Sequence, residues 1–172
     1  PQNAALRRGD FGKILGADCY SPHTVEPTHP DFGFYGIHGV ETLYTLLGTG
    51  CEAVSRIHSP MGDIVSGRWN DGRLGTFRAV VKGPAVYGGT AFTEKGTVAA
   101  GGYAGYKVLL DEILRYFKSG ASPVSKEETL EIFTFMKASN MSLERGGRTV
   151  MMDEAYAEGM KEARRLLEAY DE

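Results

Sequence analysis

Polar side chains that could do chemistry gather in one short stretch of the chain. They are His23, Glu26, His29, Asp31 and His38. Neutral imidazole suits zinc, iron or nickel, and carboxylates can complete such a site. The spacing matches no strong metal signature, so histidines in a solvated loop are the alternative interpretation. A small metal-dependent enzyme that uses His23, His29 and His38 is therefore one hypothesis for the chain.

His38 is the best placed of these groups for proton transfer, because the residues around it predict a helix. Residues 33–48 begin as a glycine-rich turn and continue with apolar residues at helical spacing, up to Gly48. The imidazole lies near the predicted helix start, and Glu41 follows three residues later. An imidazole titrates at about 6.5 and can move protons near neutrality. On the pattern alone, a core helix whose histidine is satisfied by hydrogen bonds is favoured over a catalytic one.

Length and composition indicate one ordinary globular domain. The chain has 172 residues, a length that suits one domain with a sizeable core. Its net charge of −3 and pI near 5.9 do not indicate nucleic acid or an acidic membrane as a partner. No apolar run is long enough to span a bilayer and no signal peptide is visible, which favours a cytoplasmic protein. Cys19 and Cys51 are too few for a disulfide scaffold, so both are expected to be small buried residues.

The predicted strands and helices follow in an order typical of an α+β protein. Strand-like runs occupy residues 13–20, 51–58, 63–69, 75–81, 86–93, 97–100 and 149–152. Helices are predicted over residues 33–48 and after Tyr106, Ser125 and Asp153, and Ser125 with Glu128 has the pattern of a capping box. We expect one domain over residues 1–172, with an open, mostly antiparallel sheet covered on one face by helices.

The other face of this sheet is expected to be free for dimer packing. Gly88, Gly89 and Ala91 lie inside a predicted strand, which suggests that another backbone or sheet approaches closely there. The sequence holds no dinucleotide fingerprint, phosphate loop or nucleophile elbow. The glycines within residues 101–105 precede a predicted helix but lack the dinucleotide spacing.

Several segments, taken in order, resemble the C-terminal domain of one oxidoreductase family. They are a Gly-x-x-Gly-Lys-Ile motif at residues 9–14, a Gly-Ile-His motif at 36–38 that opens a helix closing at Leu47-Gly48, a helix pair over 106–138 and a late strand at 146–150. The family is that of glucose–fructose oxidoreductase and inositol dehydrogenase (Gfo/Idh/MocA). Each match is weak alone, but together they cover nearly the whole chain and are fairly specific.

This resemblance implies an NAD(P)-dependent oxidoreductase that acts on a sugar, polyol or related compound. It assigns His38 a substrate-binding or proton-transfer role, so His38 is the expected catalytic residue. Phe34 stands where many members carry an aspartate, four residues before the histidine. The substrate-binding residues are therefore expected among Tyr35, Glu41, His23 and Asp31.

The resemblance also implies what the chain works with. NAD or NADP would bind an N-terminal Rossmann domain that lies outside these residues, and no cofactor is expected on this chain alone. The implied partners are a sugar-like small molecule, that Rossmann domain and a second copy of the chain through the open sheet face. A non-enzymatic carbohydrate-binding or assembly module remains the alternative to an oxidoreductase domain.

Overall fold

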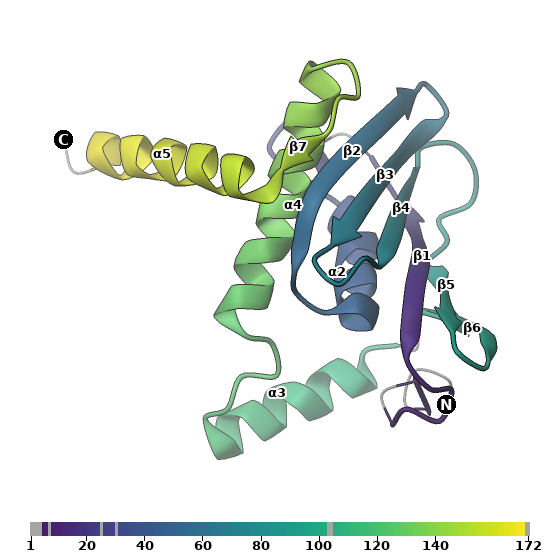
Figure 1. The fold of residues 1–172 in the computed structure, drawn as a ribbon. Helices are drawn as coiled ribbons and strands as arrows, with labels where there is room; N and C mark the ends of the chain where they lie inside the picture. The colour runs from purple at the N-terminus through teal and green to yellow at the C-terminus, as the bar shows by residue number, and fades with distance from the viewer. Residues whose placement is uncertain (1–4, 7, 25, 30, 103–104, 171–172) are drawn as a thin grey trace.

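Seven strands form one open sheet (Figure 1). The computed structural model describes the chain except residues 1–4, 7, 25, 30, 103–104 and 171–172. The strands are β1 (Ile14–Pro22), β2 (Cys51–Ser59), β3 (Gly62–Trp69), β4 (Leu74–Val80), β5 (Gly88–Thr93), β6 (Gly96–Ala100) and β7 (Val150–Met151). Their order across the sheet is β6-β5-β1-β4-β3-β2-β7. In the described sheet β1 and β4 run parallel and the other neighbours antiparallel, which confirms the expected mostly antiparallel arrangement.

Two helices, α2 (Gly36–Leu47) and α4 (Lys126–Glu144), cover one face of this sheet, as expected for the α+β class. The other helices are the short 3-10 helix η1 (Asp31–Gly33), α3 (Lys107–Ser119) and α5 (Met152–Tyr170). Helix α2 packs on β1 and β4, α4 packs on β2, and the two helices touch each other. The parallel pairing of β1 with β4 needs a long connection, and α2 with the β2–β3 hairpin supplies it.

Helix α2 lies close to the sheet because it carries a glycine where the two meet. Val40 and Leu43 are fully buried on its inner side. A Cβ at Gly39 would lie 2.6 Å from Cδ2 of Phe77 and 2.9 Å from Oγ of Ser21, so a larger residue would push the helix away. This contact fixes which side of α2 points outward.

Local signals in the sequence set several element ends. The Asn70-Asp71-Gly72 turn joins β3 to β4, and Gly72 has a φ of 86°, which a glycine adopts without strain. Oγ of Ser125 accepts a hydrogen bond of 3.0 Å from the amide of Glu128, so the predicted cap of α4 is confirmed. Helix α5 begins at Met152, one residue before Asp153, which was predicted to cap it.

The small residues of β5 are explained within the sheet itself. A Cβ at Gly88 would lie 2.6 Å from the hydroxyl oxygen of Tyr20, and one at Gly89 would lie 2.6 Å from the carbonyl oxygen of Asp18. Ala91 is fully buried and packs in a small cluster with Leu6, among others. The predicted close approach is therefore accounted for by strand β1 within the same sheet.

Two helices extend from the body with little cover (Figure 1). Helix α3 has no buried residue, and its apolar side chains are 39% to 76% exposed. Helix α5 packs its first turns on α4 and then leaves Leu166 and Leu167 more than half exposed. Among the described residues, no helix is long and apolar enough to cross a membrane.

Candidate functional site

The outer side of α2 carries the imidazole that was predicted to do chemistry. His38 and Glu41 lie on the helix side opposite the buried Val40 and Leu43. The Nδ1 atom of His38 is 3.0 Å from Oε2 of Glu41, and both side chains are about half exposed. When Nδ1 donates to this carboxylate, the lone pair of the neutral ring lies on Nε2. The pair can therefore accept or deliver a proton at the surface of the molecule.

Tyr35 immediately precedes α2 and has an unusual backbone. Its φ is 60° and its ψ is −35°, and it is the one non-glycine residue with positive φ in the described part of the chain. Such a conformation costs on the order of 1–2 kcal/mol for a residue with a side chain. Oγ of Ser21 donates to the Tyr35 carbonyl oxygen at 3.1 Å, which helps to hold the turn. Strain of this kind concentrates at functional sites, and here it sits beside His38.

The rings around His38 come from two separate parts of the chain. The Tyr35 ring centroid lies 4.6 Å from that of Phe34 and 6.3 Å from that of His38. Tyr87, in the connection between β4 and β5, places its ring centroid 6.0 Å from that of His38. Burial raises the pKa of Tyr87, and the neighbouring phenols of Tyr35 and Tyr106 raise it further. Tyr87 therefore stays a neutral hydrogen-bonding phenol through the physiological pH range.

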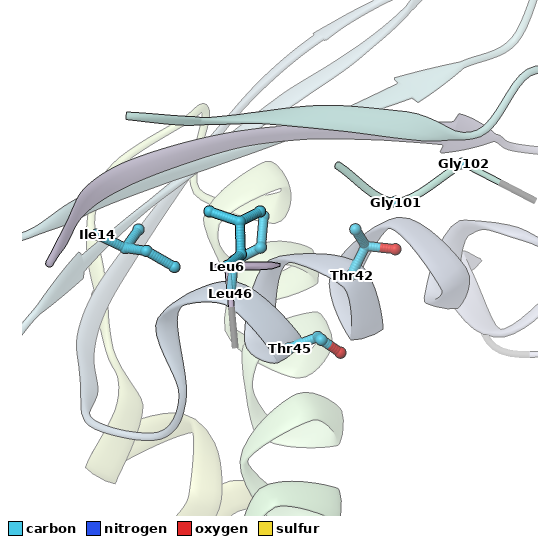
Figure 2. A pocket seen from close by; sticks show the side chains of 7 residues that line it. All are labelled: Leu6, Ile14, Thr42, Thr45, Leu46, Gly101 and Gly102. Carbon is cyan, nitrogen blue, oxygen red and sulfur yellow. The ribbon is translucent and has the colours of Figure 1, made fainter. Parts of the chain in front are cut away.

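A cavity of about 470 Å³ opens beside the same side of α2 (Figure 2). It is lined by Leu6, Ile14, Thr42, Thr45, Leu46, Gly101 and Gly102. Thr42 follows His38 by one helical turn, and its Oγ1 donates to the His38 carbonyl oxygen at 2.8 Å. The cavity therefore lies beside the side of α2 that carries His38. Its lining consists of apolar side chains, threonine hydroxyl groups and the backbone of two glycines.

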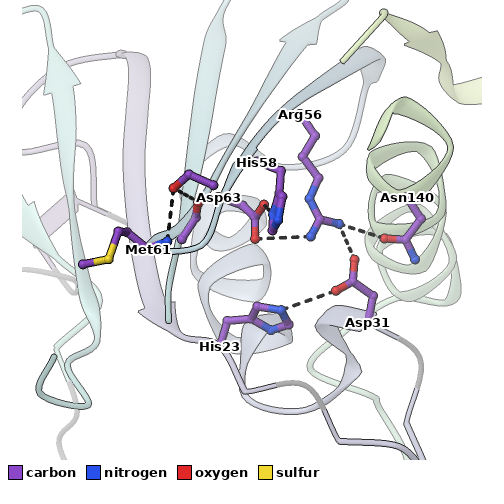
Figure 3. A network of polar contacts seen from close by, with 9 residues as sticks. His23, Asp31, Arg56, His58, Met61, Asp63 and Asn140 are labelled. Carbon is purple, nitrogen blue, oxygen red and sulfur yellow. Dashed lines mark hydrogen bonds and ion pairs between the residues drawn. The ribbon is translucent and has the colours of Figure 1, made fainter. Parts of the chain in front are cut away.

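A buried network of charged groups lies behind the segment that leads into α2 (Figure 3). Arg56 of β2 is only 3% exposed and sits between two carboxylates, those of Asp31 and Asp63. Its Nη2 is 3.2 Å from Oδ2 of Asp63, and its Nη1 bonds Asp31 and also donates to Oδ1 of Asn140 at 3.0 Å. The guanidinium carbon lies 4.2 Å from the centre of the Phe32 ring. This cluster ties η1 to β2, β3 and α4.

One imidazole accompanies each of these carboxylates. Nε2 of His23 is 3.4 Å from Oδ1 of Asp31, and Nδ1 of His58 is 2.6 Å from Oδ1 of Asp63. Burial by itself would raise the pKa of Asp31, but hydrogen bonds from His23 and Arg56, together with their positive charge, lower it below its ordinary value. Asp31 is therefore a stable anion that anchors η1, and through η1 the start of α2.

The structure brings together some of the predicted site residues and separates others. Tyr35, His38 and Glu41 share one exposed surface. His23 is 4% exposed and, with Asp31, belongs to the buried network, and a substrate-binding role for these two residues stays a prediction. His23 directly follows Pro22, the last residue of β1, and its ring centroid lies 4.9 Å from that of Phe32 in η1.

The three histidines of the metal hypothesis do not meet. His29 packs its ring 5.4 Å from that of Phe34, while His23 and His38 bond different carboxylates. Among the described residues, no group of three or more histidine, cysteine and acidic side chains is arranged to hold a metal ion. The hypothesis of a metal site at His23, His29 and His38 is therefore not supported by the positions of these residues.

Several residues of this region were not identified from the sequence. Arg56 on β2 and Asp63 on β3 point to the side of the sheet that the helices cover. Asp63 is on the same side of β3 as the buried Val65 and Trp69. A charged residue at a strand position whose alternating neighbours are apolar and buried indicates a buried ion pair, so the sequence could have revealed this one. Tyr87 has no such local signal, because its position beside His38 depends on the sheet order.

Comparison with known proteins found similar solved structures, while no family model and no curated protein matches the sequence. A probable dehydrogenase of Thermotoga maritima is 18% identical with a TM-score of 0.68, covering 90% of this chain and 61% of that one. Scyllo-inositol dehydrogenase of Lactobacillus casei, with NAD(H) and scyllo-inositol, is 13% identical with a TM-score of 0.70, covering 88% and 60%. The WlbA dehydrogenase of Bordetella pertussis, with NADH and UDP-GlcNAcA, is 18% identical with a TM-score of 0.63, covering 87% and 57%.

The chain spans about three fifths of the length of these dehydrogenases. At such low identity the likeness concerns the fold, and it extends over almost the whole of this chain. The resemblance to the C-terminal domain of Gfo/Idh/MocA dehydrogenases, predicted from short motifs, is therefore confirmed at the level of three-dimensional structure. This chain has the fold of one part of the sugar and polyol dehydrogenases of that type.

Proposed function

We propose that the chain is the substrate-binding and oligomerisation domain of an NAD(P)-dependent oxidoreductase acting on a sugar, polyol or related compound. One observation carries the proposal: in a fold shared with sugar and polyol dehydrogenases, a half-exposed His38–Glu41 pair stands at the start of α2. The substrate class comes from those relatives, whose bound molecules are scyllo-inositol and UDP-GlcNAcA.

His38 is the residue that would handle the proton. Oxidation of an alcohol to a carbonyl removes a hydride, which NAD(P)⁺ on the proposed partner domain would accept, and the hydroxyl proton, which the lone pair on Nε2 of His38 can accept. Glu41 receives the Nδ1 proton in a hydrogen bond, so it holds the ring orientation and stabilises the imidazolium that forms. In the reverse direction the same imidazolium returns the proton to the alkoxide.

The nucleotide would be held by a separate domain. The described residues do not fit a dinucleotide alone, since the glycines between β6 and α3 lack the spacing that cradles a pyrophosphate. Helix α3 supports a partner domain, because Leu109, Leu110, Ile113 and Phe117 form one apolar side that nothing in the described chain covers. An N-terminal Rossmann domain is the partner that we propose for this surface.

The test is an assay of the full-length gene product with NAD⁺ and NADP⁺ against inositols and hexoses. We expect His38→Ala to lower kcat by about 10²- to 10⁴-fold, the usual range for a lost general base. Lys161→Ala is the control, because Lys161 is exposed on α5 and stands outside the surface that carries His38. An unchanged kcat in His38→Ala contradicts the proposed chemistry, and tight sugar binding without any turnover favours the carbohydrate-binding module instead.

The open sheet face is the surface that we propose for oligomerisation. Its central row runs across five strands through Ser55, Ser66, Thr76, Asp18 and Thr90. These short side chains leave the face flat enough for a second sheet to lie on it. Ser66→Arg would place a long cation in the middle of this row, and light scattering should then show a lower mass than for the parent chain. The same mass for both proteins would contradict this interface.

A further inference from the structure

A continuous row of aromatic rings crosses the surface that carries His38. His29 packs on Phe34, Phe34 packs edge-on to Tyr35, and the rings of Tyr35 and Tyr87 both lie near the imidazole of His38. The two tyrosines come from different segments, one from the turn before α2 and the other from the β4–β5 connection. Two phenol rings from distant parts of the chain therefore lie within about one ring's reach of the same imidazole, with centroid distances of 6.3 Å and 6.0 Å.

Both tyrosines are held in place by more than their own contacts. The Tyr35 backbone has positive φ, and a glycine there would remove this strain. Tyr35 keeps a side chain at a position that favours glycine, and that side chain remains 44% exposed, so burial in the core does not explain it. Tyr87 directly precedes the buried Gly88 of β5, which fixes the point from which its ring leaves the sheet.

We propose that Tyr35 and Tyr87 form an aromatic clamp around His38 that receives the ring of a carbohydrate or cyclitol, and that Tyr87 determines specificity for a cyclic substrate. This inference rests on the proposed function, adds Tyr87 to the site and gives Tyr35, already expected to bind substrate, a defined role. Pyranose and cyclitol rings present C–H groups on their faces, and the electron-rich face of a phenol attracts such positively polarised hydrogens. Their hydroxyl groups lie at the ring edge, where His38 and the phenol hydroxyls can bond them.

The clamp also accounts for the missing aspartate. Phe34 occupies that position and supports the Tyr35 ring from 4.6 Å, with an interplanar angle of 72°. Recognition here would depend on ring stacking and on neutral phenol donors and acceptors in place of a second carboxylate. The substrate ring is thereby oriented against His38, and the acid–base chemistry remains with His38 and Glu41 alone.

The test is an NMR titration of the 172-residue chain with myo-inositol, D-glucose and the acyclic polyol glycerol. We expect the cyclic probes to shift the signals of His38 and Tyr87 at concentrations where glycerol does not. Tyr87→Ala and Tyr35→Ala should each weaken binding of the cyclic probes about tenfold, while Tyr87→Phe, which keeps the ring, should stay within about threefold. Tyr156→Ala is the control, since Tyr156 is 45% exposed on α5 and outside the clamp.

The outcomes separate this inference from the function on which it rests. Cyclic probes that bind both alanine variants within twofold of the parent chain overturn the clamp and leave the proposed function standing. Binding that is lost in the alanine variants, with His38→Ala still active in the full-length enzyme, supports the clamp and overturns the role of His38. A folded chain that binds neither cyclic probe overturns the clamp and the substrate class together. Circular dichroism of every variant confirms that it is folded.

Discussion

Replacing Arg56 by methionine should be among the most damaging single changes in this protein. The guanidinium is 3% exposed, and it is the cation between Asp31 and Asp63, of which Asp63 is only 2% exposed. Methionine fills similar space but removes the guanidinium shared by the two carboxylates, which then keep only the imidazoles of His23 and His58 as partners. Removal of one partner from a buried ion pair typically costs about 3–5 kcal/mol of unfolding free energy, a large part of the stability of a domain of this size.

The measurement is urea unfolding followed by fluorescence of Trp69, the single tryptophan, which is 1% exposed in the core. Arg68→Met is the matched control, because Arg68 pairs with Glu52 at 3.7 Å on the surface and such pairs contribute at most about 1 kcal/mol. The double variant Arg56→Met with Asp63→Asn should recover part of the loss, since it removes one of the uncompensated charges. This recovery distinguishes an electrostatic cause from lost packing.

A loss below about 1 kcal/mol in Arg56→Met, equal to that of Arg68→Met, would refute the reasoning. It would mean that water reaches the carboxylates and that the network does not anchor η1. The surface that carries His38 offers a second readout, because Asp31 opens the segment that leads to Tyr35 and α2. Because the Arg56–Asp31 ion pair anchors η1, the NMR signals of Tyr35 should broaden or shift in Arg56→Met and stay unchanged in Arg68→Met.

Three further predictions concern stability and reactivity. The ionised form of Asp31 contributes its full stabilisation above the ordinary pKa of 3.8, and this contribution should be lost as the pH falls through the lower pKa of the folded state. The free energy of unfolding of Asp31→Asn, measured in acid, should therefore depend less on pH in that range than that of the parent chain. Gly39→Ala should cost about 1–3 kcal/mol in urea unfolding, because its Cβ would press on Phe77, and an unchanged midpoint would contradict the observed helix–sheet distance. Burial raises the pKa of Cys19 and Cys51 to about 12, so neither thiol should react with Ellman's reagent at pH 8 until the chain is unfolded. Rapid labelling of the native protein would contradict this, because it would show that the thiols are accessible.

Local patterns in the sequence were enough to determine most of the elements. Helical spacing located α2, α3, α4 and α5, and alternation located the strands, because these periods reflect which side of an element is buried. The same patterns predicted the buried cysteines and the Ser125 cap, and the Gly-Ile-His motif directed attention to His38 at the start of α2. Each of these features depends on residues that are near one another along the chain.

Tertiary structure decided the sheet order and the composition of the site. The parallel pairing of β1 with β4 puts residues from distant segments side by side, and no local pattern encodes it. Packing also brings His23 and Asp31 into an ion network with Arg56 of β2, and it brings Tyr87 next to His38. Periodicity in a sequence reports the burial of one face, but which distant side chains meet is decided only when strands and helices pack together.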